Sequence, residues 1–228
     1  MAKAYLSATL DTRATVDGAS LVGDFAVAEG WGTMDYQNGI LSYNQDLHRQ
    51  EIVDWVDGSG VCAAFDFTLK GILHEAISRC EYRRLVDHRG RAPGVNGWWP
   101  ARAVSFVDNH DTCHHWPFPE QAVEQGYAYI LSHPGIPCLF WPHVIADGGE
   151  GKLARLVDLR RKAGIHADAK MDVIRCNDSM YVAKVQGTVS DVLVKLGPAF
   201  DMGYAEPDGH LWELWSCGRD WAVWKSRN

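Results

Sequence analysis

The stretch Ala103-Val-Ser-Phe-Val-Asp-Asn-His-Asp111 joins a run of apolar, β-favouring residues to a polar group that holds two carboxylates. A short apolar run with polar residues after it predicts a strand buried on both faces. The chain contains three further runs of this kind, at Phe25-Ala-Val-Ala28, Ala63-Ala-Phe-Asp-Phe67 and Pro137-Cys-Leu-Phe-Trp141. Glu29 follows the first of them, so two of the four predicted strands end in acidic residues.

Helical periodicity lies between these predicted strands. Apolar residues recur at helical spacing in residues 45–56, 69–85, 120–131 and 151–162. Residues 2–14 also have a helical pattern and predict the last helix of a preceding unit. The alternation of strand and helix predicts parallel strands with right-handed crossovers, in a (β/α) barrel or in a doubly wound sheet.

The period of the pattern changes near Lys170. Alternation with period two appears in Met180–Val185, Asp191–Leu196 and Asp220–Lys225, with glycines in the segments between them. This pattern predicts antiparallel strands. We therefore divide the chain into a partial barrel, residues 1–169, and a C-terminal antiparallel β-sheet domain, residues 170–228.

Composition restricts the class of partner. The 228 residues carry a formal charge of -7 and 46% hydrophobic residues, as expected of a globular domain. The acidic balance argues against nucleic acid, and no apolar run approaches the roughly 20 residues that cross a bilayer. Six cysteines without a C-x-x-C pair predict mostly free thiols, and ten tryptophans slightly favour a carbohydrate ligand.

Carboxylates at the C-terminal ends of parallel strands lie on the face where active sites of such folds are built. Glu29, Asp108 and Asp111 have this position. Retaining glycoside hydrolysis uses a general acid and a carboxylate nucleophile roughly 5 to 5.5 Å apart. Glu29 follows four apolar residues, and partial desolvation there would favour a proton donor.

Several ordered segments resemble the α-amylase family in its plant and green-algal form. Phe106-Val-Asp-Asn-His-Asp111 is similar to the family's F-V-D-N-H-D motif, and Phe25-Ala-Val-Ala-Glu29 to its general-acid strand. Further similar blocks occur in the family's order at residues 44–51, 64–73, 97–100 and 125–137. The resemblance implies the C-terminal half of a (β/α)8 TIM barrel followed by a small antiparallel sheet domain.

The resemblance also implies roles for individual residues. Glu29 would be the general acid/base, Asp111 the carboxylate that stabilises the transition state, and His110 a ligand of the distorted sugar. Asp108 and Asn109 would hold the loop in shape, and Asp66, between two Phe residues, would be structural.

The tandem Trp98-Trp99 resembles a starch-granule site, although packing is an equally good reading of these residues. His114 and His115 lack the spacing of a known metal motif, so we assign no metal ligand.

Two parts of the family pattern are missing from this sequence. The nucleophile aspartate would precede Met1, and the inserted domain that supplies most calcium ligands is absent, so calcium is implied by the family alone. We therefore expect a fragment of an enzyme that hydrolyses internal α-1,4 bonds of starch or malto-oligosaccharides. The alternative is a non-catalytic glucan-binding or regulatory protein. The sequence gives no prediction of compartment.

Overall fold

The computed structural model describes residues 14–16, 19–21, 26–30 and 32–227. Strands β1 (Ala14–Val16) and β2 (Ala19–Leu21) form an antiparallel pair. The helix expected at residues 2–14 lies outside the described residues, except for Ala14, which begins β1. Two further short strands, β4 (Tyr36–Gln37) and β5 (Ile40–Leu41), form a second antiparallel pair.

A four-stranded parallel sheet with the order β3-β6-β7-β8 forms the first part of the body. Its strands are β3 (Val27–Ala28), β6 (Ala63–Phe65), β7 (Ala103–Phe106) and β8 (Ile136–Cys138). The connecting helices are α2 (Asp46–Ser59), α3 (Phe67–Ser78) and α5 (Val123–Ser132). Sequential parallel pairing with a helix in each connection is the arrangement that the alternating pattern predicts.

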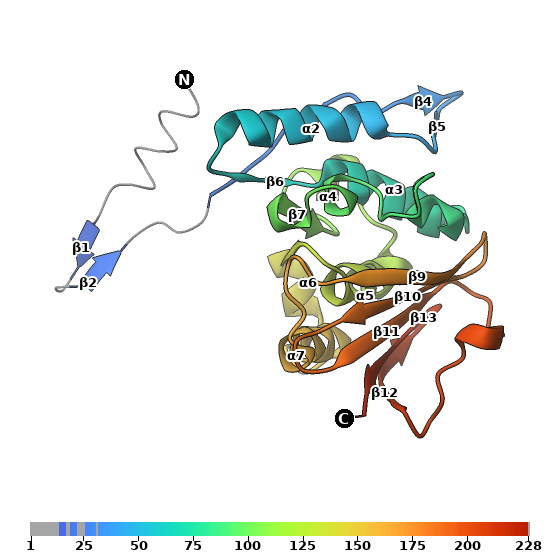
Figure 1. Cartoon of the computed structure of the whole chain (residues 1–228). Helices are drawn as coiled ribbons and strands as arrows, with labels where there is room; N and C mark the ends of the chain where they lie inside the picture. The colour runs from blue at the N-terminus through green and yellow to red at the C-terminus, as the bar shows by residue number, and fades with distance from the viewer. Residues whose placement is uncertain (1–13, 17–18, 22–25, 31, 228) are drawn as a thin grey trace.

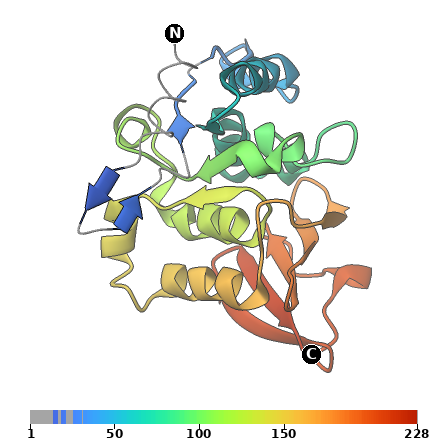
Figure 2. The same cartoon turned by 60° about the vertical axis from the view of Figure 1, so that its left-hand side comes forward.

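Further helices and helical turns lie between and after the parallel strands. They are the 3-10 turns η1 (Tyr82–Leu85), η2 (Val95–Gly97), η3 (Pro100–Arg102) and η4 (Glu120–Ala122), and helices α4 (Thr112–His115), α6 (Trp141–Ala146) and α7 (Lys152–Ala163). Figure 2 shows β7 and β8 side by side as neighbours in the parallel sheet.

Three expected elements differ clearly from those observed. The strand expected over 63–67 ends at Phe65, and Phe67 already begins α3, because Asp66 caps that helix. The helix expected over 69–85 ends at Ser78, because Cys80 takes a positive φ of 55° and the amide of Glu81 turns back to the carbonyl of Ala76. The strand expected over 137–141 ends at Cys138, and Trp141 begins α6. Proline in the first turn of that helix favours a helix start, since its missing amide hydrogen needs no partner there.

A five-stranded antiparallel sheet with the order β12-β13-β11-β10-β9 forms the second part. Its strands are β9 (Met171–Cys176), β10 (Tyr181–Gln186), β11 (Asp191–Leu196), β12 (Trp212–Gly218) and β13 (Trp221–Ser226), and a 3-10 turn, η5 (Gly203–Ala205), lies between β11 and β12. β9 and β12 are additional to the three strands that the sequence predicts. Figure 1 shows α2 and α3 at one end of the body and this sheet at the other.

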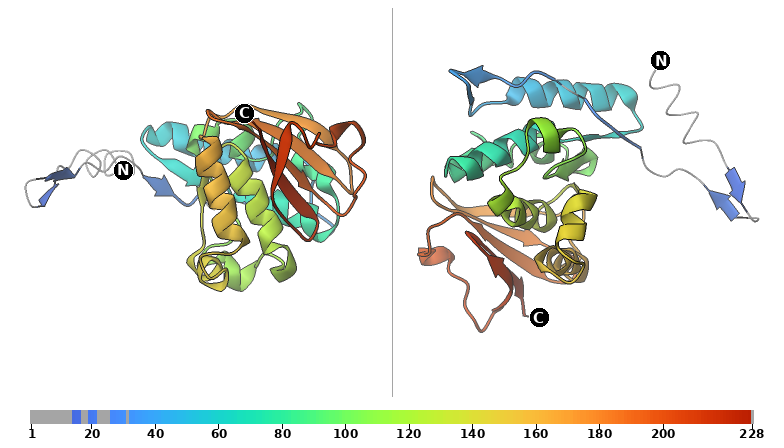
Figure 3. Two further views of the ribbon diagram at one scale, coloured as in Figure 1. Left: turned by 90° about the horizontal axis from the view of Figure 1, so that it is seen from below. Right: turned by 180° about the vertical axis from the view of Figure 1, so that it is seen from behind.

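The antiparallel sheet shares a hydrophobic core with helices of the parallel half. α5 and α7 lie side by side, as Figure 3 shows, and contact each other and the antiparallel sheet. Tyr127 and Tyr129 of α5 pack in the same cluster as Tyr181 of β10 and Val223 of β13. The alternate residues of the sheet, such as Val182 and Leu193, form a smaller cluster on its other face. The domain division at residue 169 stays a prediction, although α7 ends at Ala163 and β9 begins at Met171.

Candidate functional site

The structure brings Glu29 and the loop after β7 together. Glu29 follows β3 and residues 108–111 follow β7, so both segments leave the same end of the parallel sheet. The side-chain amide of Asn109 donates a hydrogen bond of 3.4 Å to Oε1 of Glu29. The expectation that Glu29 and Asp111 leave the same end of the strands agrees with this topology, while their catalytic roles stay a prediction.

Asn109 also fixes the backbone of the loop. Its Oδ1 accepts hydrogen bonds from the amides of Asp111, at 3.0 Å, and Thr112, at 2.8 Å. Its own amide donates to Oγ1 of Thr112 at 3.0 Å. One amide side chain therefore links Glu29 to the segment that carries Asp111.

His110 and Asp111 extend from this loop towards solvent. Their side chains are 75% and 47% exposed, and His110 Nε2 lies 3.6 Å from Asp111 Oδ2. Side chains this accessible are available to a ligand that approaches the end of the sheet.

Asp108 has the loop-shaping contacts that the sequence suggests. Its carboxylate is almost fully buried and accepts hydrogen bonds from Oγ1 of Thr112 and from the amide of Phe118. The amine of Lys70 lies 3.5 Å from Oδ1, and the imidazole of His143 lies 3.9 Å from Oδ2. These contacts tie both ends of the 108–118 loop together.

One expectation about Glu29 is wrong. Four apolar residues before it suggested a partly desolvated carboxyl group, but the residue is exposed. β3 is a two-residue strand whose burial alternates, and Glu29 lies beyond its end, so the apolar run does not enclose the carboxyl group. The burial that would favour a proton donor is therefore not supplied by these residues.

Asp66 is structural, as the sequence indicates. It caps α3 by accepting a hydrogen bond of 2.9 Å from the amide of Leu69, and its second oxygen accepts one of 2.8 Å from the amide of Asn96. Burial raises the pKa of Asp66 to about 6. Its place at a helix start between two phenylalanines explains why it follows a strand without joining the exposed carboxylates.

Trp98 and Trp99 lie between the turns η2 and η3, before β7, and each is partly buried. The guanidinium of Arg49 is 3.7 Å from the centroid of the Trp98 ring. Trp99 packs against the small cluster that contains Ile52 and Val95. Both rings therefore have packing contacts, and their role in glucan binding stays a prediction.

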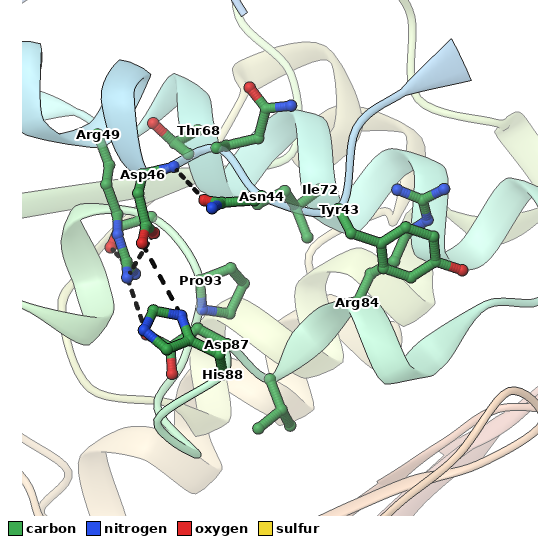
Figure 4. A pocket seen from close by; sticks show the side chains of 13 residues that line it. Tyr43, Asn44, Asp46, Arg49, Thr68, Ile72, Arg84, Asp87, His88 and Pro93 are labelled. Carbon is green, nitrogen blue, oxygen red and sulfur yellow. Dashed lines mark hydrogen bonds and ion pairs between the residues drawn. The ribbon is translucent and has the colours of Figure 1, made fainter. Parts of the chain in front are cut away.

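Arg49, which contacts the Trp98 ring, also lines a hollow of about 220 Å³, whose side chains are drawn in Figure 4. Arg49 enters it from α2 and forms ion pairs of 2.8 Å with both Asp46 and Asp87. Tyr43 also lines this hollow, whereas Glu29, His110 and Asp111 are not among its lining residues. A second hollow, of about 300 Å³, has Gly32 to Met34 on one side and Trp116 on the other, and so lies between the segment after Glu29 and the 108–118 loop.

Sequence reasoning missed Lys70 and His143, which both approach Asp108. The sequence did contain a signal for Lys70, because this lysine lies inside the apolar run Phe67–Leu73. A lysine is rarely buried without a partner, so its position in this run indicates a buried amine with a polar or charged partner. The amine is fully buried and donates a hydrogen bond of 2.6 Å to the carbonyl of Trp116. Burial lowers the pKa of Lys70 to about 8, although Asp108 opposes that shift.

The part of the chain that the structure describes has no cluster of acidic, histidine and cysteine side chains of the kind that holds a metal ion. Across residues 26–30 and 32–227 and the two short N-terminal strands, no three His, Cys, Asp or Glu residues group so that they could hold an ion. The same part of the chain has no helix with the length and apolar composition needed to cross a bilayer.

Comparison with known proteins gives matches to α-amylases. The family described as the alpha-amylase C-terminal beta-sheet domain matches residues 162–225. The protein named Probable alpha-amylase 2 of Arabidopsis thaliana is 45% identical over 206 residues, which cover 88% of this chain and 48% of that protein. The Alpha-amylase type B isozyme of Hordeum vulgare is 46% identical over 157 residues, which cover 68% of this chain and 99% of that sequence. The chain thus spans about half the length of the Arabidopsis relative.

Solved structures agree on the fold. The γ-cyclodextrin glucanotransferase (γ-CGTase) of an alkalophilic Bacillus clarkii superposes with a TM-score of 0.63 at 15% identity, over 100% of this chain and 38% of that one. The parallel half-sheet with its helices and the antiparallel sheet after it are therefore the C-terminal half of a (β/α)8 barrel and its small β-sheet domain.

Proposed function

This chain belongs to the α-amylase family of glycoside hydrolases, and from that membership we propose that it carries two catalytic carboxylates of an enzyme that cleaves internal α-1,4 bonds of starch with retention. Glu29 acts as the general acid/base and Asp111 stabilises the positive charge of the transition state. His110 binds a sugar hydroxyl beside Asp111.

The observation that carries the proposal is the Asn109 bridge. A single amide holds the Glu29 carboxylate and the backbone of Asp111 at one end of the sheet. Two carboxylates on one side of a scissile bond can perform different tasks, since the first donates a proton and the second stays ionised. His110 is exposed beside Asp111 and is accessible to a sugar there.

The reaction needs a third carboxylate. Retention proceeds through a covalent glycosyl intermediate, and none of the carboxylates in the described part of the chain occupies the nucleophile's place in the family pattern. We propose that a further segment, with the first four βα units, supplies this aspartate. Calcium dependence is a general property suggested by the family, and no step here depends on it.

Reducing-end release from soluble starch tests the proposal. One sample is the 228-residue chain, and the other is a hybrid in which the first four βα units of the Arabidopsis relative precede it. We expect no amylase-type turnover by the chain alone, even with calcium, and turnover by the hybrid that Glu29→Gln lowers by about three orders of magnitude or more.

Two other outcomes would contradict the proposal. Robust turnover by the 228-residue chain that disappears on Glu29→Gln would show a nucleophile among these residues. A folded hybrid that binds malto-oligosaccharides without cleaving them would favour the non-catalytic glucan-binding alternative.

A further inference from the structure

Lys70 is a cationic side chain enclosed within the protein. It lies on α3 in an apolar run and has 0% of its side chain exposed. Its Nζ donates to the carbonyl of Trp116 at 2.6 Å and lies 4.3 Å from the centroid of that residue's ring. The Phe118 ring is also close, at 5.6 Å. The amine therefore binds the distal end of the 108–118 loop through both a hydrogen bond and aromatic contacts.

The same amine reaches the start of the loop through Asp108. Nζ lies 3.5 Å from Oδ1 of Asp108, which accepts a hydrogen bond from Oγ1 of Thr112. Thr112 in turn bonds with Asn109, the residue that binds Glu29 and the amide of Asp111. A continuous series of polar contacts thus runs from Lys70 to both exposed carboxylate segments.

The groups that face Lys70 leave Asp108 as its counter-charge. His74, one turn along α3, has a pKa lowered to about 4 by burial and by the nearby lysine. Burial also lowers the pKa of His143, which approaches Asp108 from α6. Both imidazoles are thus biased towards the neutral form around neutral pH, while the buried Asp108 carboxylate pairs with the ammonium group.

We propose that Lys70 is a positioning residue for the proposed reaction: its side-chain amine fixes both ends of the 108–118 loop and thereby sets the place of Asp111 relative to Glu29. The pKa of Lys70, lowered to about 8 from its ordinary value of about 10.5, makes the stability of this arrangement depend on pH. Because this pKa is lower in the closed arrangement than in an open one, protons bind preferentially to the open form, so the closed arrangement gains stability relative to the open one as the pH rises above about 8.

Amide hydrogen exchange in the 228-residue chain tests the proposal without any glucan. The probes are the amides of Asp111, Thr112 and Phe118, which donate to Asn109 or Asp108. In the wild type we expect their protection factors, corrected for the intrinsic pH dependence, to rise about tenfold between pH 7 and pH 9, with the rise beginning near pH 8.

In the variant Lys70→Met, we expect the same protection factors to be about tenfold lower than in the wild type at pH 7. Their pH dependence should show no step near pH 8. The protection factors of amides in β10 and β11 should change less than about twofold. Lys152→Met is the matched control, since Lys152 is exposed and pairs with Glu124 at 2.9 Å. It should keep the wild-type profile.

Other outcomes overturn the proposal. A wild-type loop whose protection stays level or falls from pH 7 to 9, or a step that persists in a folded Lys70→Met variant, would contradict the role of Lys70. If Lys70→Met does not fold, the double variant Lys70→Met with Asp108→Asn removes both charges and should fold, still without the step. The inference rests on the proposed function because it treats Asp111 and Glu29 as catalytic. The exchange measurement does not depend on turnover, so the role of Lys70 and the proposed function can each fail while the other holds.

Discussion

Asp66 connects three segments through one side chain. It caps α3, holds the amide of Asn96 and lies against Gly94, whose φ is 72°. A Cβ at position 94 would come within 2.4 Å of Oδ1 of Asp66, so this turn requires glycine both for its conformation and for the close approach. The carboxylate therefore determines how η2 and the residues before β7 are placed.

Replacing Asp66 should destabilise the protein locally and globally. We expect Asp66→Ala to lower the free energy of unfolding by about 2 to 4 kcal/mol, because a helix cap is lost and a second buried amide loses its acceptor. Urea unfolding measures this difference. Asp57→Ala, at an exposed position of α2, is the control and should change the value by less than about 0.5 kcal/mol. Equal effects of the two variants would contradict this account of Asp66.

The tandem tryptophans give a second prediction for single residues. Changing Trp98 and Trp99 to Ala should weaken adsorption to starch granules several-fold, because a sugar stacked on an aromatic face contributes about 1 kcal/mol per ring. Both rings also pack against the protein, so the free energy of unfolding should fall as well, by roughly 2 to 4 kcal/mol.

The exposed Trp55 of α2 provides the control for adsorption. Trp55→Ala should leave both granule binding and stability close to wild type. A double variant that remains folded and adsorbs normally would show that Trp98 and Trp99 serve packing alone.

α5 and β10 are joined through the buried imidazole of His133, just beyond the end of α5. Nδ1 contacts the carbonyl of Tyr129 at 2.7 Å, and Nε2 contacts the hydroxyl of Tyr181 at 2.8 Å. Burial lowers the pKa of His133 to about 3, assisted by the charge of Arg160. The link between the helix and the antiparallel sheet therefore requires a neutral ring.

This link should weaken in acid. The ring has a lower pKa in the folded chain than its ordinary value of about 6.5, so protons bind preferentially to the unfolded chain. The stabilisation is present above about pH 6.5 and is lost progressively towards pH 3, by at most about 1.4 kcal/mol per pH unit. Urea unfolding at several pH values, compared between wild type and His133→Asn, measures it. If the free energy of unfolding changed with pH equally in the two proteins between pH 6 and pH 4, His133 would be excluded as the source of the acid sensitivity.

Sequence periodicity predicts elements well where the pattern is regular. β11 was predicted with its observed bounds, since strict alternation and a turn glycine leave few other possibilities. Periodicity predicts the bounds of an element wrongly where one residue changes the backbone conformation, as Cys80 does after α3 and Pro142 does in the first turn of α6. The exposure of Glu29 depends on what packs around a loop, which an apolar run before it does not reveal.

The parallel sheet has two edges within the described chain. β3 and β8 are its outer strands, and exposed apolar side chains follow β8, with Trp141 at 69% and Ile145 at 63% exposed. Unpaired strand edges beside apolar surface favour association with other chains. The arrangement resembles a barrel wall whose two ends have not met.

The 228-residue chain should therefore self-associate in solution. Sedimentation velocity over a range of concentrations should show a mass that rises with concentration, and Trp141→Glu should reduce this rise. Glu213→Gln, an exposed change on β12, is a control and should not affect it. A chain that stays monomeric at all concentrations would contradict this prediction.

The strand order of the antiparallel sheet also has a consequence for biosynthesis. β13 is the last strand along the chain, yet it pairs with both β11 and β12 in the interior of the sheet. During translation, β12 cannot join the other strands until residues 221–226 have left the ribosome, and the apolar face of α5 stays partly uncovered until then. A premature stop codon just before Trp221 would thus remove the strand that connects β12 to the sheet, and we expect such a nascent product to be retained by chaperones and degraded.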